Sequence, residues 1–235
     1  MNSHDEETRD LAVRERVFLN LLEAVNRVHD LGVPHLSINP ETIWVENNSE
    51  VLLFPFRVPY EEETEAYPMW YLAPEYLFNS PEYYFNHEWD MWSLGWIFYD
   101  LFTESPPLFA SKDPHSKLIK LFEVLGFPDL EHVPYINEDT HMYLYTHTFV
   151  KECKQSKMPE IFSLIDHITP PLAAILMNML HFNPHDRPWV TPDVFLDNWQ
   201  NINNLWINGS YENYDNDTNE RSQSFRDKSP IKVCD

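Results

Sequence analysis

The stretch Trp89-Asp-Met-Trp-Ser-Leu-Gly-Trp-Ile-Phe-Tyr-Asp-Leu-Phe102 decides how the rest of the chain must be arranged. Its polar side chains are Asp90, Ser93 and Asp100, and at 100° per residue they fall within an arc of roughly 80° of a helix. The remaining circumference is apolar, so the helix must be buried, and it is too short to cross a bilayer. The stretch therefore predicts the central helix of a globular domain. Asp90, in its first turn, is placed to bond the backbone of a neighbouring loop.

The composition limits the classes of partner and of site. The chain has 235 residues, of which 43% are hydrophobic, so it can bury a substantial core in one domain. Its formal net charge of −22 at pH 7 disfavours nucleic acid and anionic membrane as partners and favours basic protein segments. The four glycines stand far apart, so no glycine-rich phosphate-binding motif can be assembled from them.

The ends of the chain differ in composition from its middle. We expect an acidic N-terminal lead at residues 1–10, one domain over residues 11–206, and a tail at 207–235 that is disordered because it is rich in Asn, Asp, Ser and Lys. The two cysteines lie far apart in sequence, and neither a secretory signal nor an apolar run of membrane length is present. These features predict an intracellular protein, cytoplasmic or nuclear.

Hydrophobic periodicity predicts a mainly α-helical domain with one small β-hairpin. Apolar residues at three- and four-residue spacing predict a long amphipathic helix from Leu11 to near Gly32. Two short runs, Thr42–Val45 and Glu50–Phe54, flank the turn residues Asn47-Asn-Ser49 and predict a hairpin. Further helices are predicted over residues 116–125, 170–181 and 191–199.

Three segments, in this order, resemble motifs of the eukaryotic protein kinases: Ala73-Pro-Glu75, Asp90-Met-Trp-Ser-Leu-Gly95 and Asn183-Pro-His-Asp-Arg-Pro188. Trp70-Tyr-Leu-Ala-Pro-Glu75 is similar to the W-Y-R-A-P-E of the cyclin-dependent and MAP kinase group. Leu121-Phe-Glu-Val-Leu-Gly-Phe-Pro128 is similar to the same group's helix followed by L-G-x-P. The resemblance implies the helical bundle of a kinase C-terminal lobe. The N-terminal lobe is expected to be missing, because the long helix begins too early to leave room for it.

Structural roles carry over from the resemblance to three residues. Taken alone, Glu75 and Arg187 could be two separate surface charges, but their separation of 112 positions matches, in order, a buried pair of the family, so they are expected to pair. Asp90 is expected to hold the backbone of the loop around His35. All three roles maintain the fold.

The catalytic residues of the family do not carry over. Phosphoryl transfer depends on a positioned base, on metal-holding groups and on a lysine at the phosphates. Where the family has H-R-D-x-K-P-E-N, this chain reads His35-Leu-Ser-Ile-Asn-Pro-Glu-Thr42. Ser37 therefore stands for the aspartate, Asn39 for the lysine and Thr42 for the metal-binding asparagine.

The metal-binding D-F-G motif is also altered, since Pro55-Phe-Arg57 stands in its place. Phe56 keeps a packing role, but Pro55 cannot hold Mg²⁺ and Arg57 brings a positive charge to the position of the metal. Trp44 replaces a smaller apolar residue beneath the adenine. We therefore expect no catalytic residues, no cofactor and no metal site.

These features predict a catalytically inactive kinase-like domain, a pseudokinase, that regulates or scaffolds other proteins. It would do so by mimicking a kinase C-terminal lobe, with the surface around Ser116–Asp129 offered to the partner. The alternatives are a divergent serine/threonine kinase or ATP-binding domain, and a C-terminal fragment of a longer kinase-like chain.

A candidate interface lies on the face that a kinase N-terminal lobe would cover. Trp44, Phe54 and Phe56 would be exposed there, and large apolar patches usually mark an interface. We expect a partner protein (a kinase, a kinase regulator or a substrate), a second copy of the chain, or the chain's own tail to cover this face. Trp206 and Ile207 are the tail residues expected to make the contact.

Overall fold

A computed structural model describes residues 3–46, 49–54, 69–77, 86–103, 114–129, 132–136, 156–157, 170–199 and 232–233. Some of the positions singled out in the sequence lie outside this part of the chain: Pro55, Phe56, Arg57, Trp206 and Ile207.

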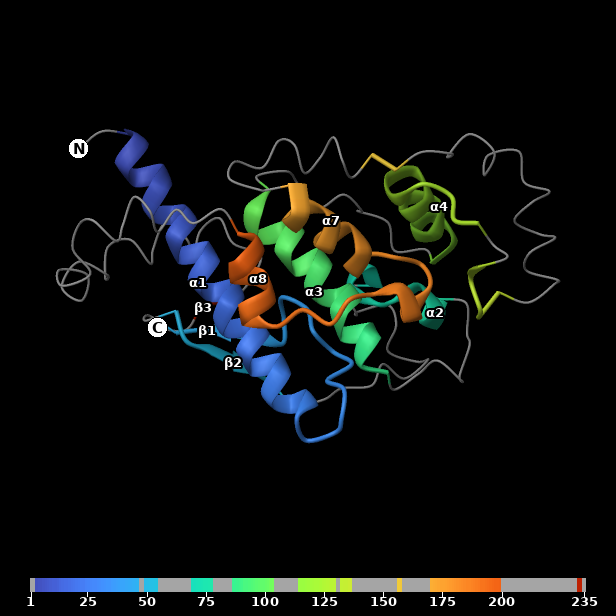
Figure 1. The fold of residues 1–235 in the computed structure, drawn as a ribbon, viewed down its shortest axis with the longest axis horizontal. Coiled ribbons are helices and arrows are strands. Elements are labelled where there is room, and N and C mark those ends of the chain that lie inside the picture. Colours follow the sequence, from blue (N-terminus) through green and yellow to red (C-terminus); the bar gives the residue numbers. More distant parts are fainter. Residues whose placement is uncertain are drawn as a thin grey trace.

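The helix α3 (His87–Phe102) lies at the centre of the described structure (Figure 1). All residues from Trp89 to Tyr99 are buried, which confirms the prediction of a helix with neighbours on nearly every side. Helices α1 (Ser3–His29) and α7 (Pro170–Met179) pack against it. A Cβ at Gly95 would lie 2.8 Å from Leu180 Cδ2, so the glycine allows the end of α7 to approach α3 closely.

The helix α1 (Ser3–His29) is the long amphipathic helix that the sequence predicts. Its buried side chains are spaced by three and four residues: Val17, Phe18, Leu21, Leu22 and Val25. The helix begins at Ser3, so it includes most of the acidic lead at residues 1–10. Acidic residues are favoured in the first turn of a helix, and each added residue costs little once a helix exists. The chain leaves the helix at Gly32, where φ is +78°, a conformation that glycine adopts without strain.

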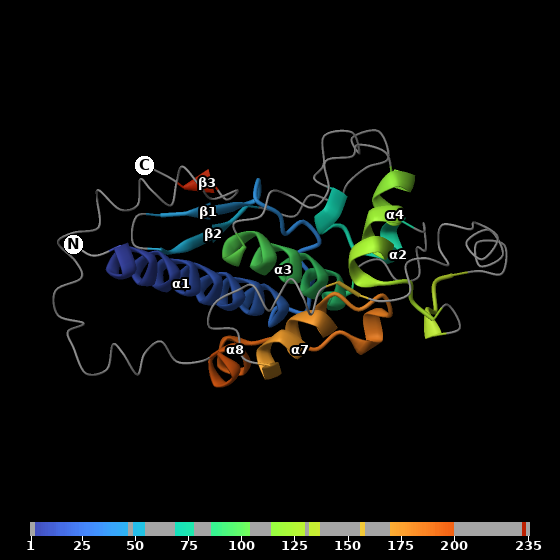
Figure 2. The same ribbon diagram turned by 90° about the horizontal axis from the view of Figure 1, so that it is seen from above.

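The small sheet lies beside α1, on the side opposite α8 (Pro192–Asn198) (Figure 2). Strands β1 (Ile43–Val45) and β2 (Val51–Leu53) pair antiparallel with Trp44 opposite Leu52, so the predicted hairpin is confirmed. Ile43 and Val45 are buried on its inner face. A third strand, β3 (Lys232–Val233), pairs parallel with β1 and gives the order β2-β1-β3. These two residues belong to the segment 207–235, whose composition predicts disorder.

The remaining elements are shorter than α3. They are η2 (Met69–Tyr71), α2 (Pro74–Leu77), α4 (Pro114–Leu125), α7 (Pro170–Met179), η6 (Pro184–Asp186) and α8 (Pro192–Asn198). As predicted, α8 begins after Thr191, whose hydroxyl accepts the Val194 amide at 3.2 Å, with Pro192 at the first helical position.

Aromatic rings join α1, α3 and α8 into one core. Phe98 and Phe102 of α3 stack with their centroids 4.3 Å apart, and Phe195 of α8 stacks on Trp199 at 5.2 Å. Phe18 of α1 lies edge-on to Phe98 at 5.1 Å. Such ring pairs stabilise beyond the area that they bury. Among the described helices, none is both long enough and apolar enough to span a membrane.

Candidate functional site

Asp90 lies in the first turn of α3 and is fully buried. Its carboxylate accepts hydrogen bonds from the backbone amides of His35, at 2.6 Å, and of Leu36, at 2.7 Å. The Nε2 atom of His29, at the end of α1, lies 2.7 Å from the same carboxylate. Leu36 has φ of +63°, a conformation that costs free energy in a residue with a side chain. Asp90 thus holds a strained loop against α3.

His35 connects this loop to the hairpin. It is buried, and its Nε2 atom lies 2.9 Å from the carbonyl oxygen of Phe54, just after β2. Burial lowers the pKa of His35, because the charged imidazolium loses its hydration, and nearby Asp90 opposes this shift. The neutral ring then donates its Nε2 hydrogen to the Phe54 carbonyl, which ties the loop to the strand.

Ser37, Asn39 and Thr42 are used to hold the shape of the loop. Ser37 and Asn39 are buried. The Ser37 carbonyl accepts hydrogen bonds from the Thr42 hydroxyl and from the side-chain amide of Asn39, the latter at 3.1 Å. The Asn39 side-chain oxygen accepts the Glu41 amide at 2.8 Å. The Thr42 hydroxyl oxygen also accepts a hydrogen bond from the backbone amide of Asn39, at 3.1 Å. The loop at residues 35–42 is therefore a closed, internally bonded turn.

This loop does not by itself fit a magnesium ion. Mg²⁺ prefers carboxylate and phosphate oxygens in near-octahedral geometry, whereas Ser37, Asn39 and Thr42 offer neutral groups that are already bonded within the loop. In the described part of the chain, no group of three or more His, Cys, Asp or Glu side chains is arranged to hold a metal. An ion here would take its ligands from other residues.

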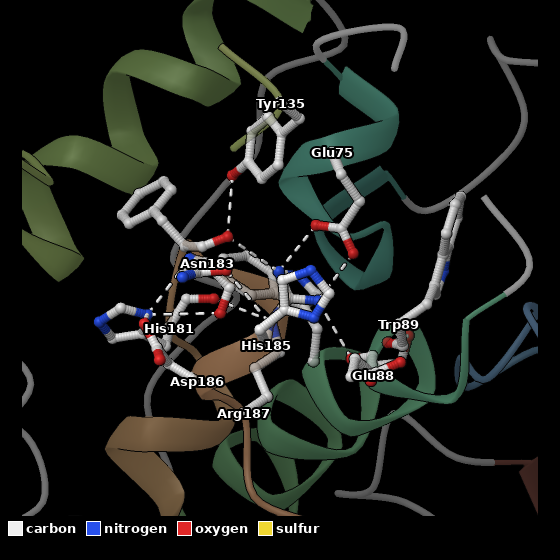
Figure 3. Close-up of polar contacts among 12 residues, drawn as sticks. Glu75, Glu88, Trp89, Tyr135, His181, Asn183, His185, Asp186 and Arg187 are labelled. Carbon is white, nitrogen blue, oxygen red and sulfur yellow. Dashed lines mark hydrogen bonds and ion pairs between the residues drawn. The ribbon is translucent and has the colours of Figure 1, made fainter. Parts of the chain in front are cut away.

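Glu75 and Arg187 form a buried, two-pronged ion pair (Figure 3). The two guanidinium nitrogens Nη1 and Nη2 each lie 2.7 Å from a carboxylate oxygen, and both side chains are fully buried. Arginine has five N–H donors, and the other three reach the backbone carbonyls of His181, Glu88 and Phe182. The pair joins α2, the start of α3 and the segment before η6.

Two further residues support the Arg187 guanidinium, and no pattern in the sequence predicts either role. The Tyr135 hydroxyl donates to the same Phe182 carbonyl at 3.0 Å (Figure 3), and Trp92 places its ring centroid 5.1 Å from the guanidinium carbon. Burial raises the pKa of Tyr135, so its hydroxyl keeps its proton and donates.

A second polar contact on α3 was also missed from the sequence. The Tyr71 hydroxyl donates to the Asp100 carboxylate, and the Ser93 hydroxyl donates to the Tyr71 carbonyl at 2.7 Å. Burial raises the pKa of Asp100 from 3.8 to about 6, and the hydrogen bond from Tyr71 opposes this shift. The polar stripe of α3 thus has a partner for each member, since Asp90 holds the loop while Ser93 and Asp100 hold η2.

The raised pKa of Asp100 predicts a pH dependence of stability. An acid with a higher pKa when folded binds more protons in the folded state, so between about pH 4 and 6 the free energy of unfolding should fall as pH rises. Asp100→Asn should flatten that fall, whereas Asp197→Asn, at an exposed position of α8, should not. Urea denaturation at several pH values measures both variants, and an unchanged slope in Asp100→Asn would contradict the assignment.

The described part of the candidate interface lies on the outer face of the hairpin. The rings of Trp44 and Phe54 are 4.9 Å apart, and Leu52, opposite Trp44 on β2, belongs to the same face. Leu52 is 46% exposed and Phe54 is 43% exposed. Trp44, Leu52 and Phe54 form what we call the hairpin face.

Comparison with known proteins gives the family. The model of the protein kinase domain matches residues 4–199. The chain is 29% identical over 184 residues to the serine/threonine-protein kinase ppk23 of Schizosaccharomyces pombe, which covers 73% of this chain and 43% of that protein. It is 30% identical over 173 residues to mitogen-activated protein kinase 1 of Oryza sativa (71% and 41%) and 30% identical over 175 residues to mitogen-activated protein kinase 6 of Arabidopsis thaliana (71% and 42%).

These matches correct one expectation. The prediction that the chain is not an enzyme is wrong, because the matched family and these relatives are protein kinases. The expectation of inactivity rested on the altered positions Ser37, Asn39 and Thr42 and on Pro55 and Arg57, and neither the family match nor the relatives show inactivity. The matched segments make up less than half the length of these curated relatives. The chain belongs to the protein kinase family, and its similarity is to the group that contains the MAP kinases.

Proposed function

We propose that this chain acts in serine/threonine protein phosphorylation and that its helical lobe binds another protein through the hairpin face. The observation that carries the proposal is the exposure of Leu52 and Phe54 beside the half-buried Trp44 on one side of the sheet. Apolar side chains gathered in this way usually mark a binding surface.

The charges around the hairpin face indicate the chemistry of the partner. Glu41, Glu46 and Glu50 are exposed on or beside the hairpin, and residues 41–54 contain no lysine or arginine. An apolar face with an acidic rim suits a protein segment that combines apolar and basic side chains. A kinase, a kinase regulator or a substrate with such a segment is the proposed partner.

The anchors described above would keep this surface in place. His35 bonds the Phe54 carbonyl, and Asp90 in turn holds the His35 amide, so the end of β2 is linked to α3 through two contacts. A surface fixed to a buried helix loses little freedom on binding, which favours affinity.

The binding proposal predicts a loss of partner capture in a Leu52→Ser/Phe54→Ser variant. Leu31→Ser/Leu196→Ser is the matched control, because it also removes two exposed apolar side chains but leaves the hairpin face intact. We expect proteins retained by the parent chain from native cells to be retained by the control and lost from the hairpin variant. Melting curves must show both variants folded. Retention of the same proteins by the hairpin variant would contradict the proposal.

The second candidate function is phosphoryl transfer to a serine or threonine hydroxyl, which the family match and the names of the relatives favour. It predicts transfer of labelled phosphate from Mg-ATP to a protein substrate, in proportion to the concentration of the chain. A heat-denatured sample is the control. Transfer no greater than in that control, across several protein substrates, would count against this candidate.

A further inference from the structure

The strand β1 has an edge that the hairpin does not use, and the structure pairs that edge with the end of the chain. Trp44 lies opposite Lys232 and Val45 opposite Val233, in parallel register. Because β1 is near the start of the chain and β3 is its last element, this pairing joins distant parts of the sequence. Figure 2 shows β3 beside β1. We propose that this edge of β1 is a docking site for the chain's own basic C-terminal segment, residues 226–234, of which Lys232–Val233 forms β3. The inference does not rest on the proposed function.

The hydrogen-bond pattern of the hairpin leaves this edge available. The Phe54 amide donates to the Thr42 carbonyl and the Glu46 amide donates to the Glu50 carbonyl, each at 2.9 Å. In an antiparallel pair, hydrogen-bonded positions recur at every second residue, and Thr42 and Glu46 occupy two of them. Trp44, midway between them, therefore also points its amide toward β2. The amide of Val45 therefore points away from β2, toward β3. An unpaired strand edge of this kind readily accepts another strand.

The charges of the two segments are complementary. Residues 226–234 contain Arg226, Lys228 and Lys232 with one acidic residue, Asp227, in a chain whose net charge is −22. Residues 41–54, by contrast, carry acidic side chains and no basic ones. Attraction between them favours the chain's own C-terminal segment as the occupant of the edge.

Docking at this edge would act on the loop at residues 35–42. Thr42 is the last residue of the loop, directly precedes β1, and accepts the Phe54 amide. His35 bonds the Phe54 carbonyl. A third strand on β1 therefore restrains the strand that leads out of the loop as well as the hairpin that closes over it.

Cross-linking tests the register. In a background with Cys153→Ser and Cys234→Ser, Trp44→Cys/Lys232→Cys places two cysteines on adjacent strands, whose spacing of about 4.8 Å permits a disulfide. Leu52→Cys/Lys232→Cys is the control, because Leu52 is one strand further away, at about 10 Å, which is too far to bridge. We expect mild oxidation to cross-link the first variant within one chain at least ten times faster than the control. Equal rates, no cross-link, or a cross-linked dimer would overturn the proposal.

Amide exchange tests the docking with Trp44 in place. In the full chain, Lys232→Pro/Val233→Pro removes both strand donors, and Ser222→Pro/Gln223→Pro is the matched control outside the strand. We expect the Val45 amide to exchange at least tenfold faster in the first variant only, while the Trp44 amide, which faces β2, is unchanged. Unchanged exchange at Val45, or protection that disappears when the parent chain is diluted, would exclude docking within one chain.

Discussion

Replacing Arg187 by Ala should lower the free energy of unfolding by about 3–5 kcal/mol, because it leaves the buried Glu75 carboxylate without its partner. The loss also removes one hydrogen-bond donor from each of three backbone carbonyls. A change of this size is a large fraction of the stability of an ordinary domain. Urea denaturation followed by circular dichroism measures it.

The chain contains a matched control for this prediction. Arg27 pairs with Glu23 across one turn of α1, at 2.5 Å, but the two side chains are 75% and 53% exposed. Because water already solvates both charges, Arg27→Ala should cost about 0.5 kcal/mol or less. The double variant Glu75→Ala/Arg187→Ala should lose less than the sum of its single changes, since it leaves no buried charge. Equal, small losses for Arg187→Ala and Arg27→Ala would show that the pair is not buried.

Asp90→Ala should be destabilising to a similar degree, and its effect should concentrate at the loop. The carboxylate accepts two backbone amides and contacts His29, and a buried donor left without an acceptor costs about 1–3 kcal/mol. Leu36 would also lose the bonds that hold it at positive φ. Thermal unfolding should show a midpoint well below that of the parent.

Asp90→Asn is the informative second variant. The amide keeps one acceptor oxygen for one of the two backbone amides but cannot accept all three contacts, so it should lie between the parent and Asp90→Ala in stability. Asp129→Ala, which removes an exposed carboxylate, controls for the loss of charge. An Asp90→Ala midpoint equal to that of Asp129→Ala would mean that the carboxylate does not hold the loop.

The sequence predicts the centre of this fold well, because burial leaves a clear pattern. The apolar run around α3 predicts a helix with neighbours on every side, and its polar residues have to find partners inside the protein. The spacing of apolar residues likewise predicts α1 and the hairpin. The position of Asp90 in the first turn predicts a bond to a neighbouring loop, but the identity of that loop came from the resemblance to kinases. The pairing of Glu75 with Arg187 also came from the resemblance, since nothing in the local sequence links two residues 112 positions apart.

What the sequence missed depends on contacts between distant residues. The contacts of Tyr71 with Asp100 and of Tyr135 with the Phe182 carbonyl form only when the elements have packed, and no spacing in the chain indicates them. His29 lies within the predicted amphipathic helix, and its position in that helix does not predict the contact of its ring with Asp90. The strand β3 lies in a polar segment whose composition predicted disorder, and its pairing with β1 supplies what the segment itself lacks.

The most direct test of the role of α3 is the exchange of the His35 and Leu36 amides, compared with that of the Trp44 amide in β1, in the parent chain and in Asp90→Asn. If Asp90 fixes the loop, both loop amides are protected in the parent, at least one of them exchanges at least tenfold faster in the variant, and Trp44 is unchanged. Equal protection of His35 and Leu36 in both proteins, with the variant folded, would contradict the central claim that α3 holds the loop through Asp90.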